Sequence, residues 1–279
     1  MEIVNYTSAN TNFVIHHSVD SGTEKNAYPI HNHRYYEIFM LLSEAATFYV
    51  EGRMYEMKRG DIILLNNIEL HQIQFDEKYD FERIVILLTK DYLDAFVKEA
   101  PGLLHPFTDK MPGLSNFIPA SLAEKEGISD CIYKIKDIAK GKVKNELEIK
   151  CWLSLALSGA ARAINKQGRD DIPYTDNALI NEILTYINEN ICENLTLENL
   201  SNKFFVSKYY LSHLFKTCTN FTLNNYVAHK KIIYADELIY SGKSAIDACF
   251  AVGFNNYSNF YRTYKKILGR TPGNKNKTI

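Results

Sequence analysis

The spacing of apolar residues changes about a third of the way along the chain. Up to about residue 90 they come in short runs rich in β-branched and aromatic side chains. These runs are separated by turn sequences such as Glu51-Gly52-Arg53 and Arg59-Gly60-Asp61. The runs are EIFMLLS, ATFYVE, RMYEM, DIILLN, HQIQF and FERIVILL. Short strands at even spacing are typical of β-sandwiches and small barrels, so this part is predicted to form one of them.

Helical spacing replaces this pattern after the Pro- and Gly-rich segment 101–119. Helices are predicted over residues 129–140 and 145–166. The second is apolar on nearly every side around Trp152, which predicts that it packs in a core or against a second copy of the chain. The polar segment 166–176 is the predicted linker, and every element beyond it is predicted to be helical.

The helical part contains an internal repeat. The segment SKYYLSHLFKTCTNFT (207–222) aligns with NYSNFYRTYKKILGRT (256–271) at an offset of 49 residues. In each copy, apolar residues recur at helical spacing on one side, while polar, basic and aromatic residues occupy the other. A shorter helix and a sharp turn precede each copy, at 197–206 and 244–254. The repeat therefore predicts two helix-turn-helix units.

The segment between the copies, residues 222–240, is predicted to be one continuous helix. At a rise of about 1.5 Å per residue it would span roughly 28 Å. Successive turns of the major groove on one face of B-DNA lie roughly 34 Å apart. A connecting helix of this length can therefore hold two recognition helices in adjacent grooves of one duplex. Ser207 and Asn256 are suited to cap those recognition helices.

These segments resemble the signature of the AraC/XylS family of bacterial transcription regulators. The matching residues are Lys230-Lys231, the block Ile246–Phe254, the helix Tyr257–Lys265 and the ending Gly269–Pro272. The resemblance covers about residues 177–272. Cys249 and Ser201 stand where alanine is usual, Asn220 where glycine often closes the first helix, and Lys275-Asn276 where the family ends in Tyr-Arg.

By this resemblance, the outward residues near the start of each recognition helix contact DNA. They are Lys208, Tyr209, Ser212, His213 and Lys216 in the first helix and Tyr257, Ser258, Tyr261, Arg262 and Lys265 in the second. Arg262 is the expected base-reading residue, because a guanidinium group fits guanine O6 and N7 with two hydrogen bonds. Lys216, Lys265 and Lys266 are expected at phosphates. The alternative for each residue is an ordinary solvated helix face.

A second motif, HNHRYYE, lies near the N-terminus. Its alternating side chains are His31, His33, Tyr35 and Glu37. On a strand these side chains would share one face, and His71 could join them from the next segment. The His-x-His-x3-Glu spacing resembles the first motif of the cupin β-barrel, and residues 60–71 resemble its second. The glycine soon after the glutamate and the Pro-x-Gly before the last histidine are missing.

Three interpretations of this set remain open. The first is a pocket for a small effector, lined by His31, His33, Tyr35, Glu37 and His71, with Arg83 placed to meet a hydroxyl or carboxylate. The second is a divalent metal held by His31, His33, Glu37 and His71, a donor set that suits Fe²⁺, Mn²⁺, Ni²⁺ or Zn²⁺. The third is a group of hydrogen-bonded histidines in a barrel mouth. Many regulators of this family sense sugars or other catabolic substrates, so the expected effector is carbohydrate-like.

Charge and composition agree with a two-part chain. The net charge is −1, yet residues 200–279 hold 12 basic and three acidic residues, while residues 1–199 hold 20 and 30. A basic C-terminal part favours a polyanionic partner. The sequence shows neither a signal peptide nor an apolar run long enough to span a bilayer, which predicts a cytoplasmic protein. The five cysteines form no CxxC pair and are predicted to be buried free thiols.

The sequence therefore predicts an α+β multidomain protein. A cupin-like β-barrel with flanking helices (1–165; barrel about 1–90, helices about 123–165) precedes the linker and an all-α domain with two helix-turn-helix motifs (177–279). We expect a ligand-responsive, non-enzymatic transcription regulator that binds promoter DNA as a homodimer, without membrane association, and activates through RNA polymerase. One alternative is a cupin metal-dependent enzyme or metal sensor with an accessory helical binding domain. Another is a helical protein-interaction scaffold without DNA.

Overall fold

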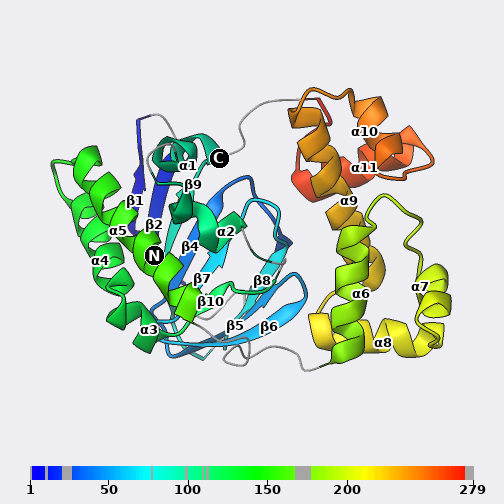
Figure 1. Ribbon diagram of the computed structural model, residues 1–279, viewed down its shortest axis with the longest axis horizontal. Helices are drawn as coiled ribbons and strands as arrows, with labels where there is room; N and C mark the ends of the chain where they lie inside the picture. Colours follow the sequence, from blue (N-terminus) through cyan, green and yellow to red (C-terminus); the bar gives the residue numbers. More distant parts are fainter. Residues whose placement is uncertain are drawn as a thin grey trace. The chain divides into compact units, whose positions relative to one another are not determined.

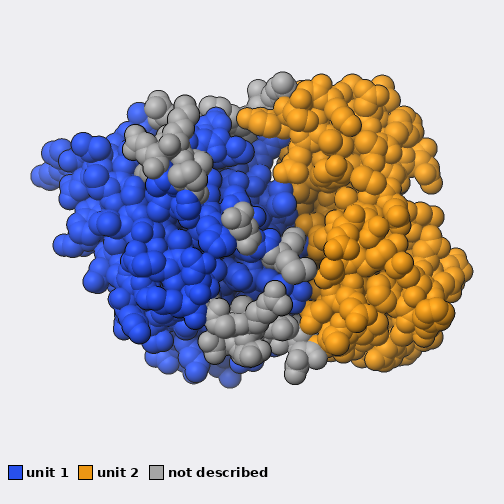
Figure 2. All heavy atoms as spheres, viewed as in Figure 1, with its two compact units in different colours: residues 1–174 blue, residues 175–279 orange. Residues whose placement is uncertain are grey.

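The chain divides into two compact units, residues 1–174 and 175–279, which are treated one at a time (Figure 2). The computed structural model describes residues 2–9, 12–20, 27–76, 78–97, 100–108, 110, 113–166 and 177–273. The predicted linker, 166–176, lies outside the described residues except for Lys166, the last residue of a helix. Among the residues described, no helix combines the length and the apolar character needed to cross a membrane.

Unit 1 is built on two antiparallel β-sheets, with strand orders β1-β2-β9-β4-β7-β10 and β3-β8-β5-β6 (Figure 1). The strands of the larger sheet are β1 (Glu2–Thr7), β2 (Phe13–Asp20), β4 (Tyr36–Leu41), β7 (Ile62–Leu65), β9 (Phe81–Leu88) and β10 (Phe117–Ile118). Those of the smaller sheet are β3 (Ala27–His31), β5 (Ala45–Val50), β6 (Arg53–Lys58) and β8 (His71–Gln74). The predicted β-structure is confirmed, but the apolar runs did not reveal β1, β2, β3 or β10.

The two faces of β4 serve different cores, which explains why all its residues are buried. Ile38 and Met40 belong to a core on the outer side of the larger sheet. Phe39 and Leu41 alternate with them and belong to the core between the two sheets, together with residues such as Phe48 of β5. A strand covered on both faces becomes almost uniformly apolar, as the run EIFMLLS is.

Helices cover the outer face of the larger sheet. They are α1 (Lys90–Val97), the 3-10 helix η1 (Pro101–Leu104), α2 (His105–Thr108), α3 (Ala120–Lys125), α4 (Ile128–Lys140) and α5 (Glu146–Lys166). Ile132 of α4 and Leu153 of α5 share one apolar core with Ile86 of β9. Both α4 and α5 begin and end within one residue of the helices predicted for them.

Unit 2 is helical in its described residues. Its helices are α6 (Ala178–Glu189), α7 (Leu197–Lys203), α8 (Lys208–Thr219), α9 (Leu223–Tyr240), α10 (Ala245–Ala251) and α11 (Tyr257–Leu268). Helices α7 and α8 form the first predicted helix-turn-helix unit and α10 and α11 the second, with α9 running between the two (Figure 1). The predicted connecting helix is thus present as α9.

Each helix of unit 2 begins at a side chain that accepts a hydrogen bond from the backbone N–H three residues later. These caps are Asn177, Thr196, Ser207, Thr222, Ser244 and Asn256. The repeat extends to the other end of the recognition helices. Asn220 (φ 60°) ends α8 and Gly269 (φ 67°) ends α11, both in the left-handed conformation that closes a helix.

All five cysteines are free, but the prediction that all are buried is wrong. Cys131 and Cys249 are buried, whereas Cys151 and Cys192 are exposed and Cys218 is intermediate. Cys151 is exposed because it lies on the side of α5 that faces away from the sheet.

Candidate functional site

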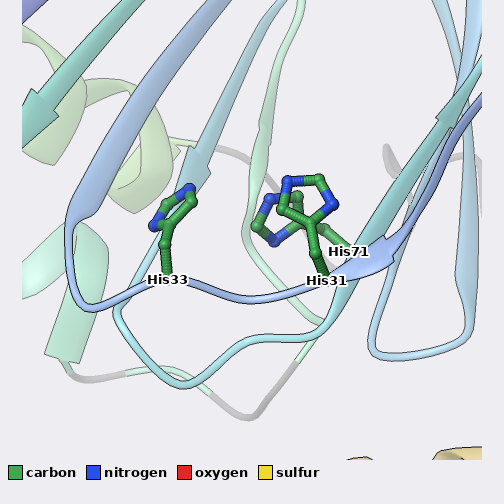
Figure 3. Close-up of side chains that lie close together, drawn as sticks. All are labelled: His31, His33 and His71. Carbon is green, nitrogen blue, oxygen red and sulfur yellow. The ribbon is translucent and has the colours of Figure 1, made fainter. Parts of the chain in front are cut away.

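His31, His33 and His71 come together where the chain passes from one sheet to the other (Figure 3). His31 is the last residue of β3 and pairs in register with His71, the first residue of β8. His33 lies in the connection that leads to β4. The prediction that residues 31–37 form one strand is therefore wrong, because β3 belongs to the smaller sheet and β4, which begins at Tyr36, to the larger.

The three imidazole rings are close enough to share one ligand. The ring centroids of His31 and His71 are 4.2 Å apart, and those of His33 and His71 are 5.0 Å apart. One nitrogen of each ring lies within 4.8 Å of the corresponding nitrogens of the other two. His71 is buried, His33 is partly buried and His31 is exposed, so the cluster runs from the interior to the surface.

Backbone carbonyls orient two of the imidazoles. Nδ1 of His33 donates to the carbonyl oxygen of Tyr35 (3.1 Å), and Nδ1 of His71 donates to that of Glu69 (3.0 Å). Because a carbonyl oxygen only accepts hydrogen bonds, Nδ1 carries a proton in both rings and Nε2 faces the cluster. An imidazole held in this way presents Nε2 to a ligand or a metal.

Glu37 closes the cluster from β4. Its Oε2 atom lies 2.6 Å from Nε2 of His33 and 3.9 Å from Nε2 of His71. Nε2 of His71 is buried and has no hydrogen-bond partner among the described residues. An unsatisfied buried polar atom costs about 1–3 kcal/mol, so this nitrogen favours any ligand that supplies a proton or a positive charge.

The environment moves the pKa values of His33 and His71 in opposite directions. Burial lowers the pKa of His33, but the hydrogen bond to Glu37 and the charge of that carboxylate outweigh burial and leave the pKa raised. Burial, followed by the charges of His31 and His33, holds the pKa of His71 well below its ordinary value. His71 is therefore a neutral imidazole at neutral pH.

The register of the larger sheet places another histidine on the same inner face. His16 of β2 pairs with Val85 of β9, and Leu87, two positions along β9, pairs with Glu37. Side chains two residues apart share a face, so His16 and Glu37 both point between the sheets. Burial is the main cause of the lowered pKa of His16. Sequence reasoning missed His16 because β2 has polar residues in its middle and shows neither a continuous apolar run nor a clean alternation.

Arg83 belongs to a separate cluster. It donates to the hydroxyl of Tyr28 (2.7 Å) and forms an ion pair with Asp20 (3.0 Å), and the Tyr28 hydroxyl also bonds Asp20. Leu87, which pairs with Glu37, is four residues from Arg83 along β9, a separation of roughly 13 Å. Arg83 therefore lies away from Glu37 and the three histidines around it, although its charge contributes to the lowered pKa of His16.

Four of the six predicted effector residues meet in one place. They are His31, His33, Glu37 and His71. Tyr35 borders this cluster, with its ring edge-on to His33 at a centroid distance of 6.1 Å. Phe48 of β5 stacks against His71 (6.0 Å, 24°), which adds an apolar surface beside the cluster. We call His31, His33, Glu37 and His71 the histidine–glutamate cluster.

The predicted DNA-contacting side of α8 is exposed. Its exposed residues include Lys208, Tyr209, Ser212, His213 and Lys216. Leu211 and Phe215 on the opposite side are fully buried. Tyr209 is 83% exposed, and its ring stacks on that of His213 at 6.4 Å. Lys208 forms an ion pair with Glu198 of α7 (2.7 Å), which orients its ammonium group beside the first helix of the unit.

Helix α11 repeats this division with one difference. Ser258, Arg262 and Lys265 are exposed, and Phe260 and Tyr264 are fully buried. Tyr257 and Tyr261 are only partly exposed, and the Tyr257 ring packs against Phe260 at 5.8 Å. These two tyrosines therefore serve the packing of α11 as well as its outer face.

Two sheets around a polar cluster, joined in one chain to paired helix-turn-helix units, define a ligand-responsive DNA-binding transcription regulator. Residues 19–157 match the family model of the AraC-like ligand binding domain, and residues 200–277 match that of a helix-turn-helix domain. The chain belongs to the AraC family of helix-turn-helix transcription regulators. Because these proteins are regulators and not enzymes, the alternatives of a metal-dependent enzyme and of a scaffold without DNA are wrong.

Similar proteins extend over one or both units. The uncharacterized transcriptional regulator YfiF of Bacillus subtilis (strain 168) is 24% identical over 253 residues, 88% of this chain and 77% of YfiF. Regulatory protein SoxS of Escherichia coli (strain K12) is 27% identical over 95 residues, 34% of this chain and 89% of SoxS. The structure of ToxT from Vibrio cholerae aligns with 94% of this chain and 97% of ToxT, with 16% identity and a TM-score of 0.42.

Proposed function

We propose that the chain controls transcription by placing α8 and α11 in successive major grooves of one promoter duplex. A small polar effector, bound at the histidine–glutamate cluster, governs this binding. The observation that supports the DNA contact is the pair of exposed, polar and basic helix faces connected by α9. Helix α9 has 18 residues, or roughly 27 Å at about 1.5 Å per residue. That length is close to the roughly 34 Å between successive groove turns.

Each recognition helix contributes residues that contact bases and residues that contact phosphates. Arg262 reads a guanine with two hydrogen bonds. The other base contacts come from the exposed outer faces, namely Tyr209, Ser212 and His213 of α8 and Ser258 of α11, with the exposed parts of Tyr257 and Tyr261 beside them. Lys208, Lys216, Lys265 and Lys266 are exposed and hold phosphates.

DNase footprinting on DNA selected by the full chain tests this arrangement. We expect two protected windows whose centres lie one helical turn apart, about 10–10.5 base pairs. Arg262→Ala should weaken the window that α11 occupies and spare the other, and His213→Ala should do the reverse. A single protected patch, or two windows that always fade together, would contradict the proposal.

The effector that best fits the histidine–glutamate cluster is a small hydroxyl-rich molecule, such as a carbohydrate-like metabolite. Imidazole nitrogens and a carboxylate hydrogen-bond readily to hydroxyl groups, and Phe48 offers an apolar surface beside His71. A thermal-shift screen against sugars and related metabolites tests this class. A ligand at 100 times its Kd should stabilise the fold by about 2.7 kcal/mol.

The same screen has a matched pair of variants. Glu37→Gln should abolish the shift, because Glu37 lies in the cluster, whereas Glu56→Gln, at an exposed position of β6, should retain it. A shift that Glu37→Gln leaves unchanged would place the effector elsewhere.

We also propose that the protein acts as a homodimer through α5. The side of α5 that faces away from the sheet carries Leu147, Cys151 and Leu155, spaced four residues apart. Leu147 and Leu155 are 71% and 55% exposed, which is unusual for neighbouring leucines on one helix face. A second copy of the same stripe would cover these side chains.

The proposed direction of control is activation in the cytoplasm, with RNA polymerase as the partner, since activation is the commoner behaviour in this family. A reporter fused to the footprinted promoter tests the sign. Deleting the regulator should lower expression in the presence of effector, and a rise on deletion would instead show repression.

A further inference from the structure

We propose that His31, His33 and His71, together with Glu37, bind one divalent transition-metal ion. The inference deepens the proposed sensing function, on which it rests for its regulatory meaning, because the ion would form part of the effector site. The chemical class is that of ions that favour imidazole, such as Zn²⁺, Co²⁺ and Ni²⁺. Mg²⁺ and Ca²⁺ are disfavoured, since they prefer oxygen donors.

The spacing of the donor atoms suits a shared ion. One nitrogen from each imidazole lies within 4.8 Å of the other two. Two nitrogens bonded to one tetrahedral ion at about 2.1 Å lie roughly 3.4 Å apart. The donors therefore need to close by little more than an ångström. His31 is exposed at the end of β3, so most of the necessary movement falls on a side chain at the surface.

The hydrogen bonds already select the nitrogens that a metal needs. With Nδ1 of His33 and of His71 donating to backbone carbonyls, Nε2 of each ring is directed at Glu37. A bare imidazole nitrogen and a carboxylate oxygen are both acceptors, so they repel unless a proton or a cation lies between them. Nε2 of His33 lies 2.6 Å from Oε2 of Glu37, where a proton joins the two atoms in a hydrogen bond, and Nε2 of His71 has no partner among the described residues. A metal ion would replace that proton and would also supply the missing partner of His71.

The four ligands come from both sheets. His31 and His71 belong to the smaller sheet, Glu37 to the larger, and His33 to the chain that crosses between them. An ion held by all four would tie the sheets together at this end of unit 1. Because binding energy to the folded state adds to stability, the loaded protein should unfold at a higher temperature than the metal-free protein.

Cobalt titration of the tag-free full chain, stripped with a chelator, tests the proposal. We expect one Co²⁺ per chain, with visible absorption bands that Zn²⁺ abolishes, and a rise in Tm with either ion. His31→Gln should weaken Co²⁺ binding at least tenfold without unfolding the protein, because His31 is exposed. His71→Gln should do the same if it folds. His105→Gln, a histidine of unit 1 outside the cluster, should bind as wild type.

Two results would overturn the proposal. One is a stripped protein that takes up no Co²⁺ or Zn²⁺ at micromolar concentration. The other is a His31→Gln variant that binds with wild-type affinity and stoichiometry, which would show uptake elsewhere. DNA binding is measured in parallel on the stripped protein. If the footprint is intact while metal is absent, only the metal inference fails, and if metal binds without any footprint, only the proposed DNA contact fails.

Discussion

Phe205 combines two unfavourable properties at one position. It lies in the turn between α7 and α8 with φ 54°, and its side chain is 95% exposed. At the corresponding place between α10 and α11 the chain has Gly253, with φ 76°. A side chain there would meet the carbonyl oxygen of Cys192 at 2.6 Å. The second helix-turn-helix thus requires glycine at this turn. The first helix-turn-helix tolerates a strained aromatic residue there because the space around the side chain is open.

Phe205→Gly should raise the free energy of unfolding by about 0.5–1 kcal/mol. Relief of the left-handed strain gains about 1–2 kcal/mol, and the greater freedom of glycine in the unfolded chain costs about 0.5–1 kcal/mol. Little apolar burial is lost, since the ring is exposed. Urea denaturation measures the change. Asn220→Gly is the control and should shift stability by only a few tenths of a kcal/mol, because asparagine tolerates this conformation. Lower stability of Phe205→Gly would show that the ring makes a favourable contact.

Arg262 should determine sequence preference and not only affinity. Arg262→Ala is expected to cost about 1–3 kcal/mol at one base position, because the two hydrogen bonds to guanine are lost. Lys265→Ala, three residues later on α11, should weaken binding to all sequences alike, because an ammonium group at a phosphate reads no base. Selection of binding sites with each variant measures the difference. Equal losses on every sequence for Arg262→Ala would assign it to the backbone.

At the scale of elements, α5 shows that an apolar pattern predicts burial of a helix but not which surface buries each of its sides. The sequence predicted a helix that packs in a core or against a second copy. The structure assigns the Leu153 and Leu157 side to the core of unit 1 and leaves the Leu147 and Leu155 side exposed. Both predicted kinds of packing therefore apply to different sides of one helix if the proposed dimer forms.

Leu155→Glu should dissociate the proposed dimer without unfolding the chain. In a symmetric dimer the substitution is present in both copies, so two buried leucines are lost from one interface. Burying one leucine contributes about 1.5–3 kcal/mol, so the free energy of dimerisation should weaken by more than about 3 kcal/mol. Sedimentation velocity over a range of concentrations measures the dimer fraction. Lys78→Glu, an exposed position between β8 and β9, serves as the control for added charge. A dimer that survives Leu155→Glu would exclude this face of α5.

Strands differ from helices in what their sequences reveal. The runs of β4 and β9 were recognised because they are long and apolar. Strand β2 contains His16, His17 and Ser18 in its middle and lacks both a continuous run and a clean alternation. Its position between β1 and β9 comes from pairing with distant residues, which local pattern does not encode.

At the scale of the whole molecule, charge is divided between the two ends of the chain. Residues 200–279 hold 12 basic and three acidic residues, although the net charge of the protein is −1. Neutralising phosphates releases bound counterions, so DNA affinity should fall steeply with salt. For six to ten phosphate contacts the loss would be about 10³–10⁵ between 50 and 200 mM salt.

Lys216→Ala should reduce the slope of log affinity against log salt by about 1, because one phosphate contact is removed. Fluorescence anisotropy with labelled operator DNA at several salt concentrations measures the slope. Lys78→Ala, an exposed lysine of unit 1, should leave it unchanged. A slope that does not respond to Lys216→Ala would remove this lysine from the DNA contact.

The sequence by itself determined the elements of unit 2 and the class of the protein. Helix periods, caps such as Ser207 and Asn256, and the repeat are local, because each depends on residues within a few turns of one another. The β-character of unit 1 was local in the same sense.

Only the tertiary structure decided how the polar residues of unit 1 are grouped. It separated His31 from Glu37 by ending one strand and beginning another in a different sheet, and then brought His71 against both. It placed His16 on the same inner face and moved Arg83 to another cluster. These outcomes depend on antiparallel register between strands far apart in the chain. A shift of one residue in that register would turn each side chain to the opposite face, and no local spacing records it.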